Sequence, residues 1–166
     1  MKYVIRPTEP TESEDVSALV QRGFAQFIAP DWEANAVSTF MAETSGECIR
    51  KLIDTATFHA VAEAQGQLFG FILMPNPSLI ELLFVGPDHL RTGIARSLWQ
   101  SARRHIDTEF KTIKTVELNS SPYAVSAYRA LGFYPISEPF RRGGCVATRM
   151  ACWLPGEALQ VGENAA

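Results

Sequence analysis

Hydrophobic and polar residues follow two different periods along this chain, and their alternation predicts a mixed α/β fold. Seven short apolar stretches bounded by turn residues predict strands, at residues 2–8, 57–65, 67–74, 78–85, 115–118, 133–137 and 145–154. The first is expected at a sheet edge. The second and third meet at Gln65-Gly66, which predicts a hairpin.

Helical spacing of apolar residues fills the intervals between these stretches. One helix is predicted over residues 12–28 and a further helical region over residues 31–56, broken at Ser45-Gly46. After Gly93, apolar residues recur at steps of four and predict a helix with one buried face: Ile94, Leu98, Ala102 and Ile106.

A shorter helix is predicted within residues 121–133, after a strand that ends at Asn119. Ser121 is placed to cap its beginning, with Pro122 at the first helical position. Gly132 stands where a left-handed residue ends a helix. The element order therefore predicts an α/β (mixed α+β) fold of about seven strands and about four helices.

Composition limits the kind of protein. Hydrophobic residues make up 46% and charged residues 20%, as in a globular domain, which we expect over residues 1–154, followed by a disordered tail at 155–166. The net charge of −3 argues against nucleic acid or an anionic membrane as partner. No signal peptide or membrane span is expected. Three cysteines without CxxC spacing and three scattered histidines predict a cytoplasmic protein with no metal site.

The stretch from Glu81 to Trp99, a strand followed by a short polar turn and a helix, is the first candidate site. The beginning of a helix offers about four backbone N–H groups without helical partners, and together with the helix dipole they attract anions. Gly93 and Ala95 keep this turn open, while Arg91 and Arg96 add positive charge. An ordinary turn would explain the glycine equally well.

A second segment favours an anion-binding site over an ordinary turn. "LLFVGPDHLRTGIARSLW" resembles the acyl-CoA motif of the GNAT superfamily of N-acyltransferases, in which V-x-P leads into Q/R-x-x-G-x-G/A. "NSSPYAVSAYRALGF" resembles the motif that follows it in that superfamily, and "GGCVATRM" resembles the last strand of one bacterial subgroup of small domains. This chain departs from the pattern at Leu90, which replaces the usual Gln or Arg, and has the permitted Ala95 at the last glycine.

The resemblance implies a central, mostly antiparallel, twisted sheet and acetyl-CoA as the acyl donor, with no metal. It implies that the strand ending at Phe84 and Val85 pairs with the pantetheine arm and splays from the next strand. Asn119 would bind the arm from the other side. The diphosphate would lie on the turn and first helical residues: Arg91, Thr92, Gly93, Ile94, Ala95 and Arg96.

Two residues are candidates for catalysis. The resemblance gives Tyr128 the role of an acid that protonates the leaving thiolate, although an isolated Tyr is more often a core residue. Glu81, which would share a strand face with Leu83 and Val85, is the preferred base for the amine, with a water-exposed carboxylate as the alternative. Glu63 is a weaker candidate. Cys145 and Cys152 lack a neighbouring histidine in sequence and are not expected to form an acyl-enzyme.

The sequence leaves the acceptor open between a small-molecule amine and a peptide N-terminus. Aromatic residues at 24–40 are mostly explained by core packing, with Trp32 a candidate for a pocket mouth. Arg141 and Arg142 are expected on a loop. A non-catalytic acyl-CoA-binding sensor on the same fold is the alternative to an acetyltransferase. A homodimer through the last strand is also left open.

Overall fold

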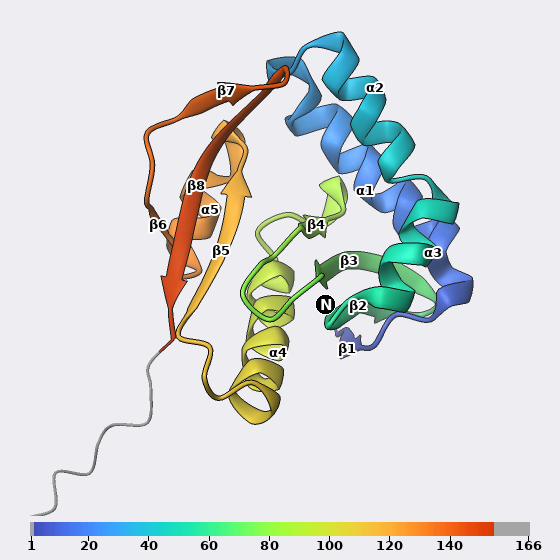
Figure 1. Ribbon diagram of the computed structural model, residues 1–166. Helices are drawn as coiled ribbons and strands as arrows, with labels where there is room; N and C mark the ends of the chain where they lie inside the picture. The colour runs from blue at the N-terminus through green and yellow to red at the C-terminus, as the bar shows by residue number, and fades with distance from the viewer. Residues whose placement is uncertain (1, 155–166) are drawn as a thin grey trace, which may run out of the picture.

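The computed structural model describes residues 2–154, which form two antiparallel sheets joined edge to edge (Figure 1). The first sheet has the order β1 (Val4–Arg6), β2 (Phe58–Ala64), β3 (Gln67–Met74) and β4 (Leu82–Val85). In the second, β5 (Thr115–Ser120) and β6 (Tyr134–Pro135) flank β8 (Cys145–Trp153), which also pairs with β7 (Phe140–Arg142). The predicted fold class is confirmed. The expected tail at 155–166 lies outside the described residues.

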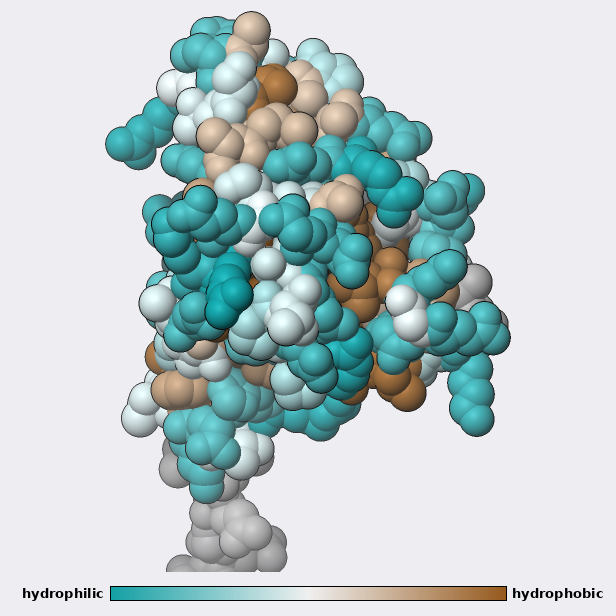
Figure 2. All heavy atoms as spheres, turned by 90° about the vertical axis from the view of Figure 1, so that its right-hand side faces the viewer, coloured by the Kyte–Doolittle hydropathy of each residue, from teal (hydrophilic) through white to brown (hydrophobic). Residues whose placement is uncertain are grey.

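Helices cover both faces of the first sheet. α1 (Ser13–Phe27) and α3 (Gly46–Thr55) pack on one face, with α2 (Ala34–Glu43) beside them, and α4 (Ile94–Glu109) packs on the other. The short α5 (Val125–Ala130) follows β5. Short 3-10 turns lie at Pro10–Glu12, Ala29–Asp31, Pro87–His89 and Pro122–Ala124. Figure 2 shows that the face carrying α1, α2 and α3 is mostly hydrophilic, with hydrophobic residues visible between the polar side chains.

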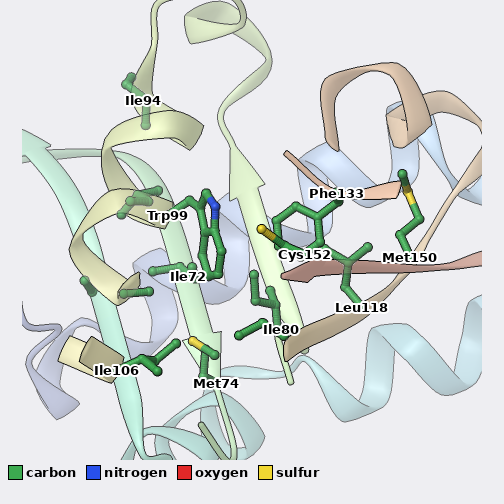
Figure 3. Packing of buried hydrophobic residues seen from close by; sticks show 14 of the residues in the cluster. Ile72, Met74, Ile80, Ile94, Trp99, Ile106, Leu118, Phe133, Met150 and Cys152 are labelled. Carbon is green, nitrogen blue, oxygen red and sulfur yellow. The ribbon is translucent and has the colours of Figure 1, made fainter. Parts of the chain in front are cut away.

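The hydrophobic stripe of α4 is confirmed as the side of that helix that faces the sheet. Its four predicted residues are at most 1% exposed, and they join side chains from β3 and from the second sheet in one cluster (Figure 3). Trp99 of α4 contacts Phe133 with ring centroids 5.0 Å apart, which ties the two sheets together on this side. α4 is thus fixed in position relative to both halves of the molecule.

The two sheets separate between β4 and β5. The N–H of Ile80 donates to the carbonyl of Glu117 (3.0 Å), and the N–H of Glu117 donates to the carbonyl of Ser78 (2.8 Å). This short parallel contact is the junction, and β4 then continues paired only with β3. The predicted strand over residues 78–85 is therefore two segments, one joined to β5 and one, β4, joined to β3.

The change of partner occurs at Glu81. The N–H of Glu81 donates to the carbonyl of Leu73 (3.1 Å), although Leu73 is paired in register with Leu82, where the β3–β4 ladder ends. The neighbours of Glu81 also break the alternation expected in a regular strand: Ile80 packs with α4, whereas Leu82 packs with α1 and α3. The face that sequence parity assigned to Glu81 is therefore not maintained through this segment.

Three further local predictions differ from the structure. Arg141 and Arg142 lie on β7, a short strand hydrogen-bonded to β8, and not on a loop. The hydroxyl of Ser121 is buried without a hydrogen bond, so this residue begins the 3-10 turn at 122–124 without capping it. β5 extends one residue beyond Asn119, to Ser120. Gly132 does adopt the predicted left-handed conformation, with φ of 96°.

Candidate active site

A cleft of about 890 Å³ occupies the gap between β4 and β5. Its walls come from both halves of the molecule: α1, α2 and β4 on one side, and β5, α5, β7 and β8 on the other. Because the strands are not hydrogen-bonded to each other here, their facing backbone groups remain open to a ligand that can pair with them.

One end of the cleft reaches the beginning of α4. Leu90 and Ala95 line it there. Gly93 precedes the helix with φ of 86° and Arg91 has φ of 60°, a left-handed conformation that a non-glycine residue adopts at a cost. The first helical bond of this turn runs from the N–H of Ser97 to the carbonyl of Gly93, so the earlier amides are free for an anion. This turn therefore leaves backbone N–H groups available to an anion.

The remaining predicted diphosphate residues surround this turn. Arg91, Thr92 and Gly93 are exposed to solvent, and Ile94 is buried in the core. The hydroxyl of Thr92 donates to the carbonyl of His89 (2.6 Å), and a guanidinium nitrogen of Arg96 donates to the carbonyl of Ala130 (3.3 Å). Thr92 thus stabilises the turn itself, while Arg96 links α4 to the end of α5.

The middle of the cleft brings together the residues predicted to hold the pantetheine arm. Phe84 and Val85 line it from β4 and are half-buried, and Asn119 lines it from β5 and is exposed. Asn119 is paired with Arg149 of β8, so its backbone is held while its side chain stays available. The predicted residues on the two strands therefore face one space.

Tyr128 lines the same cleft from α5. Its ring packs edge-on against Phe133, with centroids 5.8 Å apart, and burial raises the pKa of its phenol above the ordinary value. The phenol therefore keeps its proton at neutral pH, as a group that donates a proton must.

Glu81 also lines the cleft, on the side of α2. Glu81 is exposed to solvent, as the alternative to a catalytic role expected, yet partial burial raises the pKa of its carboxyl and the charge of Glu43, at the end of α2, raises it further. A carboxylate with a raised pKa holds a proton more readily, which suits a base. Glu63, the weaker candidate for the base, does not line the cleft. It accepts a hydrogen bond from the N–H of Gly66 (2.7 Å) in the β2–β3 hairpin.

The end of the cleft near α1 and α2 is aromatic. Phe24, Phe27, Trp32 and Phe40 line it. Sequence analysis explained these residues mainly by core packing, and the ring of Phe24 is indeed fully buried, whereas the other three are partly exposed. Sequence reasoning did not single out Tyr123, which faces them across the cleft from the turn at 122–124.

Charged groups and a thiol on the second sheet also line the cleft. Glu117 and Arg149 form an ion pair, with Nε of Arg149 donating to the Glu117 carboxylate at 2.8 Å. Burial and the charge of Glu43 raise the pKa of the Cys145 thiol, which disfavours the thiolate that an acyl-enzyme would need. Cys152 is buried in the core. In residues 2–154, no three His, Cys, Asp or Glu side chains gather as a metal site requires.

The sequence comparisons identify the class of protein. Residues 28–154 match the family model described as an acetyltransferase (GNAT) domain, so the chain belongs to the GNAT acetyltransferase family. It is thus an acyltransferase by family. A search of curated protein sequences found no match. No helix within residues 2–154 has the length and hydrophobicity needed to cross a membrane.

Solved structures show the same fold. A GCN5-related N-acetyltransferase from Rhodopseudomonas palustris superimposes with a TM-score of 0.79 at 17% identity, covering 93% of this chain and 97% of its own. PaiA N-acetyltransferase from Thermoplasma acidophilum, solved with coenzyme A, gives 0.77 at 17% identity, covering 93% and 100%. The ribosomal-protein-S18-alanine N-acetyltransferase from Escherichia coli gives 0.62 at 20% identity, covering 99% of both chains.

Proposed function

We propose that this protein transfers an acetyl group from acetyl-CoA to the nitrogen of a primary amine by direct attack. One observation carries the proposal: a single cleft joins the beginning of α4, the phenol of Tyr128 and the carboxyl of Glu81. Two proteins of the same fold, PaiA and an aminoglycoside 6'-N-acetyltransferase, were solved with coenzyme A, which supports the choice of donor.

The amides from Arg91 to Ala95 would hold the diphosphate, because they are free of helical partners and lie at the positive end of the dipole of α4. The open backbone edge at Phe84 and Val85 would pair with the pantetheine arm, and the side chain of Asn119 would hydrogen-bond it from β5. The thioester supplies an activated acetyl group. These contacts direct it toward Tyr128 and the aromatic end of the cleft.

An alkyl amine arrives protonated, and removing that proton at pH 7.4 costs about 4 kcal/mol. Glu81 takes this proton, directly or through a water molecule, and passes it to solvent. Its raised pKa makes it a stronger base than an ordinary carboxylate. The freed nitrogen then attacks the thioester carbon.

As the new C–N bond forms, the C–S bond breaks and its electron pair stays on sulfur. Tyr128 donates its phenolic proton to that thiolate, and the second proton released by the nitrogen restores the phenol. Burial disfavours the charged form of both groups, the phenolate and the thiolate, and so raises the pKa of each. The proton therefore moves between two groups whose pKa values shift in the same direction. The products are the acetylated amine and free coenzyme A.

An amine-library screen that follows free coenzyme A thiol tests this proposal, with acetyl-CoA binding measured beside it by calorimetry. Small amines, amino acids, an aminoglycoside and peptides with free N-termini make up the library. We expect thiol release with at least one class of amine. Binding of acetyl-CoA without thiol release from the whole library would contradict the proposal and favour a non-catalytic acyl-CoA sensor.

A further inference from the structure

The acceptor end of the cleft holds an aromatic pair and the carboxyl of Glu81. Phe40 and Glu43 lie three residues apart on α2 and so share a face of that helix. Glu81 and Phe84 both line the cleft from the segment opposite, whereas Glu43 is not among the lining residues. The rings of Phe40 and Phe84 have centroids 6.3 Å apart, and the charge of Glu43 acts on the Glu81 carboxyl. The cleft therefore presents both aromatic rings and the carboxyl of Glu81.

Further rings extend this apolar surface. Phe24 stacks on Phe40 with centroids 3.9 Å apart, and Trp32 meets Phe40 edge-on at 5.9 Å. We call the partly exposed cleft-lining residues Trp32, Phe40 and Phe84 the aromatic wall, and the fully buried Phe24 supports it from the core. Such rings bind apolar groups, and they favour aromatic ones through offset or edge-on packing.

The same end of the cleft is closed on several sides. The hairpin between β7 and β8 reaches α2, where the N–H of Glu33 donates to the carbonyl of Gly144 at 2.9 Å (Figure 1). Phe27 of α1 stacks on Tyr123 with centroids 4.5 Å apart and nearly parallel rings, at 12°. Residues 78–80 pair with Glu117 where the two sheets join. These contacts border the space and favour a compact acceptor over an extended polypeptide.

We propose that the acceptor is a compact primary amine carrying an aromatic ring, whose ammonium lies at Glu81 and whose ring lies against the aromatic wall. This inference rests on the proposed acetyltransferase function and names its substrate class. The carboxylate of Glu81 attracts the cation, the charge of Glu43 adds to this attraction, and the wall removes the ring from water. Burying a ring of this size should favour the amine by about 10- to 100-fold over its ring-free counterpart.

The test compares 2-phenylethylamine with ethylamine, together with an aminoglycoside and a hexapeptide that has a free N-terminus. The expected result is a kcat/KM for 2-phenylethylamine about 10- to 100-fold above that for ethylamine, and above those for the two larger acceptors. Equal values for the two small amines, or a preference for the aminoglycoside or the peptide, would overturn the inference while leaving acetyl transfer intact.

Binding keeps the inference testable if no amine is acetylated. In that case the proposed function fails, and the stabilisation of the protein by each amine, measured as a shift in Tm, decides the inference separately. 2-Phenylethylamine must raise Tm more than ethylamine at equal concentration. Equal shifts would show that the aromatic wall does not bind a ring.

Three variants assign the effect to particular residues. Phe40→Leu keeps an apolar side chain but removes a ring of the wall. It should reduce the ratio of kcat/KM for 2-phenylethylamine to that for ethylamine by about fivefold. Phe58→Leu, which alters a ring outside the cleft that contacts His105, should leave that ratio unchanged. Glu43→Gln should raise KM for both small amines alike. A ratio that Phe40→Leu does not alter would contradict the assignment, because a general loss of folded protein does not change a ratio.

Discussion

Gly70→Ala tests whether the position of α4 controls binding of the donor. Gly70 lies on β3 beneath the first turns of α4, and a methyl group there would fall 2.7 Å from Cγ2 of Ile94, 3.0 Å from Cδ1 of Leu98 and 3.2 Å from the carbonyl oxygen of Phe84. Ile94 must move by roughly 0.7 Å to restore van der Waals contact. Overpacking of this kind should lower the free energy of unfolding by about 1–3 kcal/mol.

The displaced part of α4 is the turn that we expect to hold the diphosphate. Misaligning one charge-assisted hydrogen bond should raise the Kd for coenzyme A by about tenfold. Calorimetric titration with coenzyme A measures this, and S-acetylpantetheine, which lacks the diphosphate, should lose much less affinity. The comparison of the two ligands separates the contribution of the diphosphate to the affinity from that of the pantetheine arm.

Gly66→Ala is the matched control. Gly66 has φ of 75° in the β2–β3 hairpin, and a methyl group there meets nothing within 4 Å. The left-handed conformation alone should cost about 1–2 kcal/mol of stability, with no change in Kd for coenzyme A. If Gly70→Ala is destabilised as expected but binds coenzyme A as tightly as Gly66→Ala, then the first turn of α4 does not hold the diphosphate.

Three other predictions follow from the site and the core. Tyr128→Phe should lower kcat on the order of 10²-fold with little change in the Kd for acetyl-CoA, and unchanged turnover would remove the phenol from the mechanism. The pKa of Glu81 is raised in the folded state, so its carboxylate lowers stability at pH values above the ordinary pKa of about 4.3. Glu81→Gln should therefore raise Tm at about pH 7.5, and this gain should disappear near pH 4. A gain in Tm that persists at pH 4 would refute this cause. Leu98→Ala should lower the free energy of unfolding by about 2–5 kcal/mol in denaturant titrations, whereas Ile136→Ala, at a residue that is 50% exposed, should cost less than about 0.5 kcal/mol; equal effects would contradict the packing of α4.

Sequence patterns were sufficient where one physical signal dominated. The four-residue steps from Ile94 to Ile106 identified the buried face of α4, because only one face of that helix is apolar. The break predicted at Ser45-Gly46 is also confirmed: α2 ends at Glu43 and α3 begins at Gly46, with the hydroxyl of Ser45 accepting from the N–H of Cys48. In both cases the information lies within a few turns of one element.

The sequence predictions differ from the structure where contacts between residues far apart in the chain determine the local structure. The apolar run at 78–85 looks like one strand, but it divides at Glu81 between two partner strands, and nothing in the local pattern of residues marks that division. Arg141 and Arg142 are both exposed, so β7 lacks the alternation that marks a strand, and it exists because it pairs with β8. The aromatic residues at 24–40 could not be divided between core and cleft without knowing which element faces them.

The most direct test of this account is a crystal structure with coenzyme A bound. The account predicts that the diphosphate contacts the backbone amides between Arg91 and Ala95, at the beginning of α4, and that the pantetheine arm runs between β4 and β5 with its sulfur near the phenol of Tyr128. A diphosphate held elsewhere on the protein, with the gap between these strands empty, would contradict it.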